Sequence, residues 1–316
     1  MDEVVIIEEI ACQNGDGIIA KVTINRPNKL NALNQDVVKS LKDMCDWAEE
    51  NDSVRCVIIT GAKPNPPPEG KRAKPHAFVA GADITEFAGK NSKEIRELFR
   101  DNAIEAIWNL SKPTIAMVDG FALGGGCEVA CSCDIRVAST RAIFGTPEIK
   151  LGLIPGYGGS QRLVHLVGYG RAMEMMMTGN NVSAEDAYRM GLANHLCEPQ
   201  DLEAKALELA ETIASKSMNT MRVAKKTIRA ALDNGITDGV EIEAVAFASH
   251  SIQKTKKLVF RHSLPELSQN GSTVNRHLPF HLSEQLMLLK HPVVVAKEDP
   301  ILREWEVLVE AGELPL

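Results

Sequence analysis

The first half of the chain alternates strand and helix signals, beginning with two runs of β-branched apolar residues. Val4–Ile10 and Gly17–Asn25 are rich in Val and Ile, and residues 14–17 between them have the sequence Asn-Gly-Asp-Gly. Such runs favour strands, and the glycine-containing stretch suits a tight turn. The pattern therefore predicts a β-hairpin at the start of the chain.

The apolar spacing becomes helical after residue 34. Asn34 can cap a helix whose apolar positions share one face: Val37, Val38, Leu41 and Met44. Val57–Thr60 and Pro113–Val118 are short apolar runs typical of buried strands. Between them, one helix is predicted from Asn91 or Ser92 through Trp108.

Beyond residue 124 the spacing is mostly helical. The predicted helices are Ser160–Val167, Gly170–Thr178, Ala184–Met190, Leu202–Ser215, Thr220–Asp233 and Val240–Ala248. Strand–helix units followed by a run of helices predict an α/β fold with a helix-rich end.

Residues 63–76 interrupt this order. The segment KPNPPPEGKRAKPH contains five prolines, four Lys or Arg residues and no large apolar side chain. This composition predicts an exposed loop. We expect its charges to be solvated, with docking of a partner as the alternative.

Composition restricts the class of protein. The chain has 316 residues with 44% apolar and 24% charged residues, as in globular proteins. Its 35 Lys and Arg against 42 Asp and Glu give a net charge of −7, which argues against unaided binding of nucleic acid. No apolar run reaches the roughly 18 residues of a membrane helix. The acidic start is unlike a targeting peptide, and seven sparse cysteines indicate reduced thiols, so we expect a cytoplasmic protein.

Several motifs with known chemistry are incomplete. No phosphate-binding G-x-x-x-x-G-K-[ST] sequence occurs, and Gly158-Gly-Ser-Gln161 is not a nucleophile elbow, so Ser160 is expected to cap a helix. Cys127, Cys131 and Cys133 lie close together, but no second ligand pair follows at a zinc-site spacing. We expect them to be small residues of a packed helix and not metal ligands.

Three glycines, residues 124–126, follow a predicted buried strand and open a helix. Glycines let backbone N–H groups approach a ligand, and a helix N-terminus adds unpaired donors. Such a place suits an anionic oxygen, including an enolate. Glu128 lies in the first turn and Glu148 follows Pro147, so two carboxylates could serve proton transfer beside a carbonyl. The alternative is a glycine-packed helix, with Glu128 as a dipole partner and Glu148 as a surface charge.

Three segments resemble the enoyl-CoA hydratase/isomerase (crotonase) family and occur in family order. They are residues 77–84 (AFVAGADI), 119–128 (DGFALGGGCE) and 144–159 (FGTPEIKLGLIPGYGG). The similarity extends upstream to NRPNKLNAL at 25–33 and covers about residues 4–249. It implies a crotonase-like ββα spiral core over 1–200, a helical C-terminal subdomain over 201–249 and a divergent tail over 250–316.

The resemblance also implies the site. The two backbone N–H groups of the family's oxyanion hole fall on Ala82 and Gly125, which would hold the thioester oxygen. Its two glutamates fall on Glu128, which would activate the water, and Glu148, which would deliver the proton to the α-carbon. The residues that would contact the substrate are Ala82, Asp83, Ile84, Thr85 and Gly125. Many relatives have Lys in place of Thr85.

Family isomerases usually keep the second carboxylate and replace the first. Within this resemblance, the presence of both glutamates therefore implies reversible syn addition of water to trans-2-enoyl-CoA, giving 3-hydroxyacyl-CoA, a reaction of fatty acid β-oxidation. No metal and no separate cofactor is implied, because CoA is part of the acyl-CoA substrate. The alternatives within the fold are an isomerase or a hydratase of a special acyl group. The alternative outside it is a non-catalytic or RNA-binding member, resting on Lys71, Arg72 and Lys74; the acidic total and the lack of aromatic interleaving speak against it.

The tail differs from the rest of the chain. Residues 250–316 contain five of the eight histidines but two of the 23 glycines. Synonymous codons for residues 251–257 (SIQKTKK), read in another frame, can encode YSEDQK, which is of the family's type. We therefore hypothesise a frameshift or alternative exon beyond about residue 249. Family members are trimers or dimers of trimers built through this end, so the same assembly is expected if the tail permits it.

Overall fold

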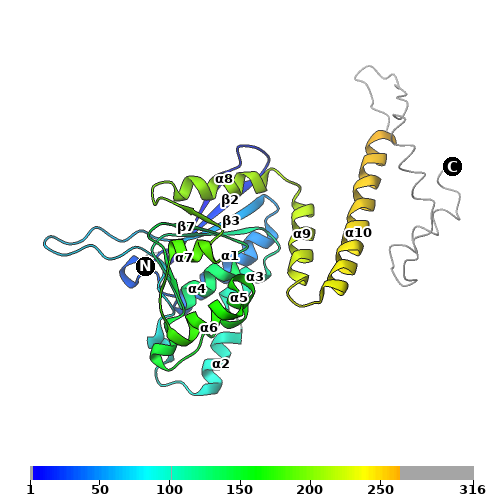
Figure 1. The fold of residues 1–316 in the computed structure, drawn as a ribbon. Helices are drawn as coiled ribbons and strands as arrows, with labels where there is room; N and C mark the ends of the chain where they lie inside the picture. Colours follow the sequence, from blue (N-terminus) through cyan, green and yellow to red (C-terminus); the bar gives the residue numbers. More distant parts are fainter. Residues whose placement is uncertain (1–2, 101, 264–316) are drawn as a thin grey trace. The chain divides into compact units, whose positions relative to one another are not determined.

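The computed structural model describes residues 3–100 and 102–263 and has a mixed α/β fold (Figure 1). The larger sheet has the strand order β1-β2-β3-β5-β7-β10. Its strands are β1 (Val5–Ala11), β2 (Ile18–Ile24), β3 (Val54–Gly61), β5 (Thr114–Val118), β7 (Ile135–Ser139) and β10 (His195–Cys197). β1 pairs antiparallel with β2, which confirms the predicted hairpin, and the other neighbours are parallel.

A smaller sheet carries the segments that lead into the candidate site. Its order is β4 (Ala77–Val79), β6 (Phe121–Leu123), β8 (Ile143–Gly145) and β9 (Val182–Ser183). β4, β6 and β8 are parallel, and β9 is antiparallel to β8. The carboxyl ends of three parallel strands therefore lie at one edge of this sheet.

The helices follow the predicted order closely. They are α1 (Gln35–Glu50), α2 (Ser92–Arg100), α3 (Ala103–Asn109), α4 (Gly125–Ser132), α5 (Gly159–Val167), α6 (Tyr169–Thr178), α7 (Ala184–Arg189), α8 (Leu202–Ala214), α9 (Met218–Ala230) and α10 (Ile236–Ser263). Short 3₁₀ turns are η1 (Pro27–Lys29), η2 (Ile84–Phe87) and η3 (Pro147–Leu151). Among the described residues, no helix combines the length and the apolarity needed to span a bilayer.

Alternating side chains of the larger sheet build two apolar layers. In β3, Cys56 and Ile58 belong to the cluster that includes the buried face of α8. Val57 and Ile59 point the other way, into the main core with α1, α4 and the smaller sheet. Figure 1 shows α8 covering one face of the large sheet. The candidate site lies on the opposite side, among the elements of the main core.

One predicted helix is divided in two. The apolar spacing indicated a continuous helix from residue 91 or 92 to 108, but the structure has two helices, α2 and α3, and Asn102 at the start of α3 has extended backbone angles. The Asn102 side chain accepts hydrogen bonds from the backbone N–H groups of Ile104 and Glu105, both at 2.9 Å. A capping side chain in mid-pattern starts a new helix because it satisfies donors that the preceding turn would otherwise bind.

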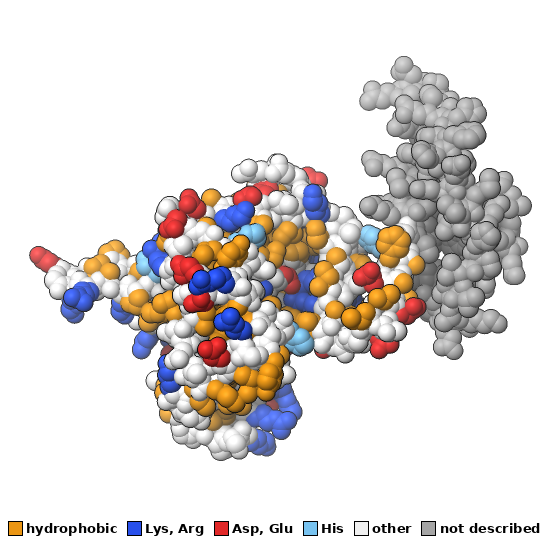
Figure 2. Space-filling model, viewed as in Figure 1, with side chains coloured by type: hydrophobic (Ala, Val, Ile, Leu, Met, Phe, Trp, Pro, Cys, Tyr) orange, Lys and Arg blue, Asp and Glu red, His pale blue; other side chains and the backbone are white. Residues whose placement is uncertain are grey.

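The proline-rich segment is an exposed loop between β3 and β4, as predicted. Residues 65–75 are exposed, and the loop projects from the body in Figures 1 and 2. Lys71, Arg72 and Lys74 lie on it, and the Lys74 ammonium donates to the carbonyl of Asn28 at 2.6 Å.

Residues up to His250 form one compact unit. The predicted divisions near residues 200 and 249 stay predictions. The hypothesis of an altered reading frame concerns a tail that, beyond Ser263, lies outside the described residues.

Candidate active site

The glycine triplet places the start of α4 directly against the smaller sheet. Gly124 is the N-cap, with a φ of +52° that favours glycine, and its N–H donates to the Gly145 carbonyl at 2.9 Å. A Cβ on Gly126 would lie 1.9 Å from the Val79 carbonyl oxygen, which no side chain permits. These glycines therefore bring the N-terminus of α4 next to the end of β4.

The segment after β4 carries Ala82 to the same place. Ala82 forms an isolated parallel bridge with Leu33, in which Leu33 N–H donates to Gly81 and Asp83 N–H donates to Leu33. In the described part of the chain, neither the Ala82 N–H nor the Gly125 N–H has a hydrogen-bond acceptor. A Cβ on Gly125 would lie 3.5 Å from the Ala82 nitrogen. Two unpaired backbone donors thus come from adjacent segments, as the sequence predicted for Ala82 and Gly125.

Glu128 projects from the first turn of α4 into a buried position. It is 2% exposed, and its Oε1 accepts hydrogen bonds from the backbone N–H groups of Tyr157 and Gly159, both at 2.8 Å. Burial raises the pKa of Glu128 to about 7, against the lowering effect of the two hydrogen bonds. The nearby Glu148 carboxylate raises this pKa further, and the Arg162 guanidinium lowers it.

Glu148 approaches the same glycines from η3. Its Oε1 lies 3.0 Å from where a Cβ on Gly124 would be, and its Oε2 is buried with no protein hydrogen-bond partner. Burial also raises the pKa of Glu148. Glu148 is therefore half-buried and not a surface charge. Carboxylates from α4 and η3 converge beside the unpaired donors, which is the arrangement that proton transfer next to a carbonyl requires.

The other predicted contact residues lie further out. The Asp83 carboxylate accepts from the Thr85 hydroxyl at 2.7 Å and from the Arg26 guanidinium at 3.3 Å. The Thr85 hydrogen bond, followed by the Arg26 contact, lowers the pKa of Asp83. Ile84 is 53% exposed, and Thr85 is also exposed. Contact of these three residues with substrate stays a prediction.

Comparison with known proteins decides the family. The sequence profile of the family described as enoyl-CoA hydratase/isomerase matches residues 14–263. The chain belongs to the enoyl-CoA hydratase/isomerase family. The match continues past residue 249, where the resemblance read from the motifs ended.

Individual relatives of this family member agree with that result. A short-chain-enoyl-CoA hydratase of Clostridium acetobutylicum is 42% identical over 234 residues, covering 73% of this chain and 85% of the relative. A crotonyl-CoA hydratase of Syntrophomonas wolfei is 38% identical over 231 residues, covering 72% and 85%. The solved structure of an enoyl-CoA hydratase from Bacillus anthracis superposes with a TM-score of 0.68 at 33% identity, covering 78% of this chain and 90% of that one. The predicted crotonase fold is confirmed.

Sequence reasoning missed the residues that hold Glu128. The segment 155–159 was recognised only as part of a family motif, whereas its backbone N–H groups at Tyr157 and Gly159 bind the carboxylate. The prediction for Ser160 was wrong, because the N-cap of α5 is Gly158 and Ser160 lies inside the first turn. The signal available in the sequence was the glycine pair Gly158-Gly159. A Cβ on Gly159 would lie 2.8 Å from Glu128 Cγ, so the pair marks another close approach.

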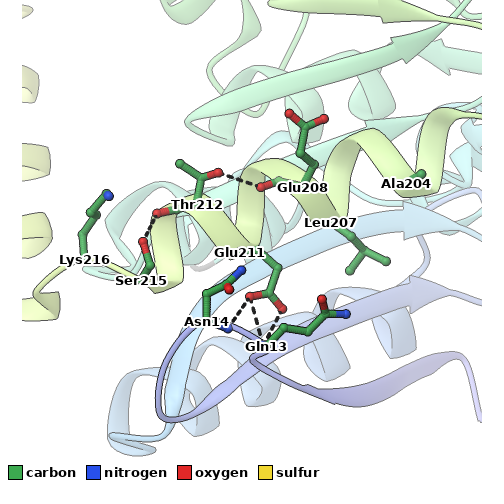
Figure 3. Close-up of a pocket in the computed structure, with 9 residues that line it drawn as sticks. All are labelled: Gln13, Asn14, Ala204, Leu207, Glu208, Glu211, Thr212, Ser215 and Lys216. Carbon is green, nitrogen blue, oxygen red and sulfur yellow. Dashed lines mark hydrogen bonds between the residues drawn. The ribbon is translucent and has the colours of Figure 1, made fainter.

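A separate cavity of about 540 Å³ lies beside the β1–β2 turn and α8 (Figure 3). The Glu211 carboxylate accepts there from the backbone N–H groups of Gln13 and Asn14. None of its lining residues belongs to the candidate site. The Glu211 carboxylate thereby ties the hairpin to α8.

Proposed function

We propose that this family member is an enoyl-CoA hydratase, which adds water reversibly and syn to trans-2-enoyl-CoA to give 3-hydroxyacyl-CoA. The observation that carries the proposal is the convergence of Glu128 and Glu148, both with raised pKa values, beside the free N–H groups of Ala82 and Gly125. The names of the relatives from Clostridium and Syntrophomonas support the same reaction.

The proposed oxyanion hole acts on the thioester carbonyl. The N–H groups of Ala82 and Gly125 donate to its oxygen, which gains negative charge as the enolate forms. Removal of one such donor typically costs about 3 kcal/mol of transition-state stabilisation. Both donors belong to the backbone and are held by β4, α4 and the 25–33 segment, so they need no reorganisation when charge develops.

The two glutamates carry the proton transfers. Glu128, ionised, accepts a proton from water as the water oxygen bonds to the β-carbon. Glu148, protonated, gives its proton to the α-carbon, which takes up the electron pair of the double bond through the enolate. Each turnover leaves Glu128 protonated and Glu148 ionised, and exchange with solvent resets the pair. The raised pKa of Glu148 favours the protonated form needed at the start.

Substitution of Glu148 tests this assignment. Glu148→Gln should lower the rate of crotonyl-CoA hydration about 100-fold or more, because an amide cannot deliver the proton. Loss of the conjugated thioester absorbance measures the rate, and Glu185→Gln on the exposed face of α7 is the control. An unchanged rate in Glu148→Gln would contradict the roles of both glutamates. Turnover of 3-enoyl-CoA without hydration of crotonyl-CoA would favour the isomerase alternative.

We also propose the remaining properties of this hydratase. CoA enters as part of the substrate, and the mechanism calls for no separate cofactor or metal. A cytoplasmic location is supported by seven cysteines, all unpaired. A trimer or dimer of trimers is supported by large apolar side chains exposed on and between α9 and α10, among them Ile228, Ile236 and Phe247. Light scattering on the full chain tests the assembly, and a monomer would contradict it.

A further inference from the structure

Arg162 links the segment that holds Glu128 to helix α3. Its Nη1 donates to the Tyr157 carbonyl at 2.8 Å, and Tyr157 N–H donates in turn to Glu128. Its Nη2 donates to Glu105 on α3 at 2.6 Å, and its side chain is 10% exposed. Gly158 makes the contact possible, because a Cβ there would lie 2.5 Å from Arg162 Nη1. Arg162 thus fixes the backbone on which the Glu128 carboxylate rests.

Arg162 also stacks on the Trp108 ring of α3, and a second arginine, Arg229 of α9, contacts the same ring. The guanidinium carbon of Arg162 lies 4.7 Å from the centre of the Trp108 ring, and that of Arg229 lies 4.1 Å from it. Arg229 also donates to Asp134 at 2.8 Å. Each cation has its own acid, Glu105 or Asp134, and the two share one indole. Cation–π contacts of this kind, when partly buried, hold a guanidinium in a defined plane.

From these contacts we propose that α9 is a positioning element for Glu128. Arg229, stacked on Trp108 and anchored by Asp134, holds Trp108 in the orientation that seats Arg162. Arg162 then keeps the 157–159 segment, with its two N–H donors, against the Glu128 carboxylate. Arg162 and Arg229 are positioning residues, since neither touches the proposed reacting atoms. This inference rests on the proposed function, in which Glu128 activates the water.

The charges that face Glu128 give this arrangement a measurable signature. Glu148 from η3 and Arg162 from α5 act on its pKa with opposite signs, and Glu128 in turn acts on the thiols of Cys127 and Cys131 within α4. Displacing Arg162 removes the cation and loosens the two backbone donors. Both changes disfavour the ionised carboxylate, so the pKa of Glu128 must rise.

The test titrates Glu128 directly. Full-length protein labelled with ¹³C at the glutamate side-chain carboxyl is followed by NMR against pH, and Glu128→Gln identifies the signal. Arg162→Gln should raise the midpoint by about 1 pH unit. Arg229→Gln and Trp108→Leu should raise it by a smaller amount. In the Arg162→Gln background, Arg229→Gln should add nothing, because it acts through Arg162.

Lys225→Gln is the matched control. Lys225 lies on the same helix and contacts Asp134 at 2.7 Å, but its ammonium donates to the Lys112 carbonyl and does not stack on Trp108. The midpoint of the Glu128 titration in Lys225→Gln should equal that in the parent protein. An unshifted Arg229→Gln, an additive shift in the double variant, or an equal shift in Lys225→Gln would overturn the proposal. If the variants show these shifts but the parent protein fails to hydrate crotonyl-CoA, the proposed function is overturned and this inference still stands.

Discussion

Glu128 and Glu148 are held in different ways, the first in a buried position and the second in a half-buried one. Glu128 receives two backbone hydrogen bonds, whereas the buried Oε2 of Glu148 has no protein partner. A carboxylate fixed by two donors suits orientation of a water molecule. An oxygen without a protein partner suits exchange of a proton with substrate. The two proposed roles therefore match the two environments.

Burial of Glu128 has a consequence for stability. Its pKa rises on folding from 4.5 to about 7, so the folded state prefers the protonated carboxyl. The contribution of Glu128 to the free energy of unfolding is fully present below about pH 4.5. It falls by roughly 3 kcal/mol as the pH rises through 7. Glu128→Gln, neutral at every pH, should be the more stable protein at about pH 9 and should equal the parent at about pH 4.5.

Urea unfolding across this pH range measures the difference. Glu185→Gln, an exposed change, should give a curve parallel to that of the parent. If the free energies of unfolding of Glu128→Gln and the parent differ by a constant amount at all pH values, the raised pKa is contradicted.

At the level of elements, the 25–33 segment fixes the strand end that carries Ala82. Arg26 donates to the Ala32 carbonyl at 2.6 Å and to the Asp83 carboxylate at 3.3 Å, which ties together the two backbone segments that bridge at Leu33 and Ala82. Asn31, with a φ of +58°, is held by its side-chain hydrogen bonds to Ala62 and Ala77. The position of the Ala82 donor thus depends on a segment far upstream in the sequence.

Breaking this ion pair should affect the chemical step more than substrate binding. Arg26→Met or Asp83→Asn should lower kcat for crotonyl-CoA about 10-fold to 100-fold, because a misplaced donor stabilises the enolate poorly. Steady-state kinetics separate kcat from KM. Arg141→Met, which breaks the double hydrogen bond to Asp119, is the control and should keep the parent's kcat. A selective rise in KM would place Asp83 in substrate binding instead.

The sequence predicted the elements well where a local pattern decides them. The hairpin, α1 with its Asn34 cap and the exposed 63–76 loop all follow from spacing and turn residues. It failed where a side chain overrides the pattern, as Asn102 does between α2 and α3. It also could not find Arg162 or Arg229, because their contacts with Trp108 join residues 54 and 121 positions apart and leave no local periodicity.

At the level of the whole molecule, the hydrogen bonds that hold the candidate site lie within residues 25–229. A chain ending at Ser263 keeps all of them and keeps α10 whole. It should hydrate crotonyl-CoA at the parent's rate, measured by the same absorbance assay. A chain ending at Lys216 lacks α9 with Arg229 and also α10, and it should lose activity, so the two truncations distinguish the tail from these two helices. Loss of activity in the chain ending at Ser263, with its circular dichroism unchanged, would show that the tail contributes.

The free N–H groups at Ala82 and Gly125 have a consequence for inherited variation. They belong to the main chain, and of the twenty amino acids only proline lacks this donor. No other missense change at position 82 can delete the proposed oxyanion donor, whereas one altered codon can remove the carboxyl of Glu128 or Glu148. Harmful alleles should therefore concentrate at the acids and at the glycines that bring the backbone close. At position 82 the course of the backbone therefore matters more than the identity of the side chain.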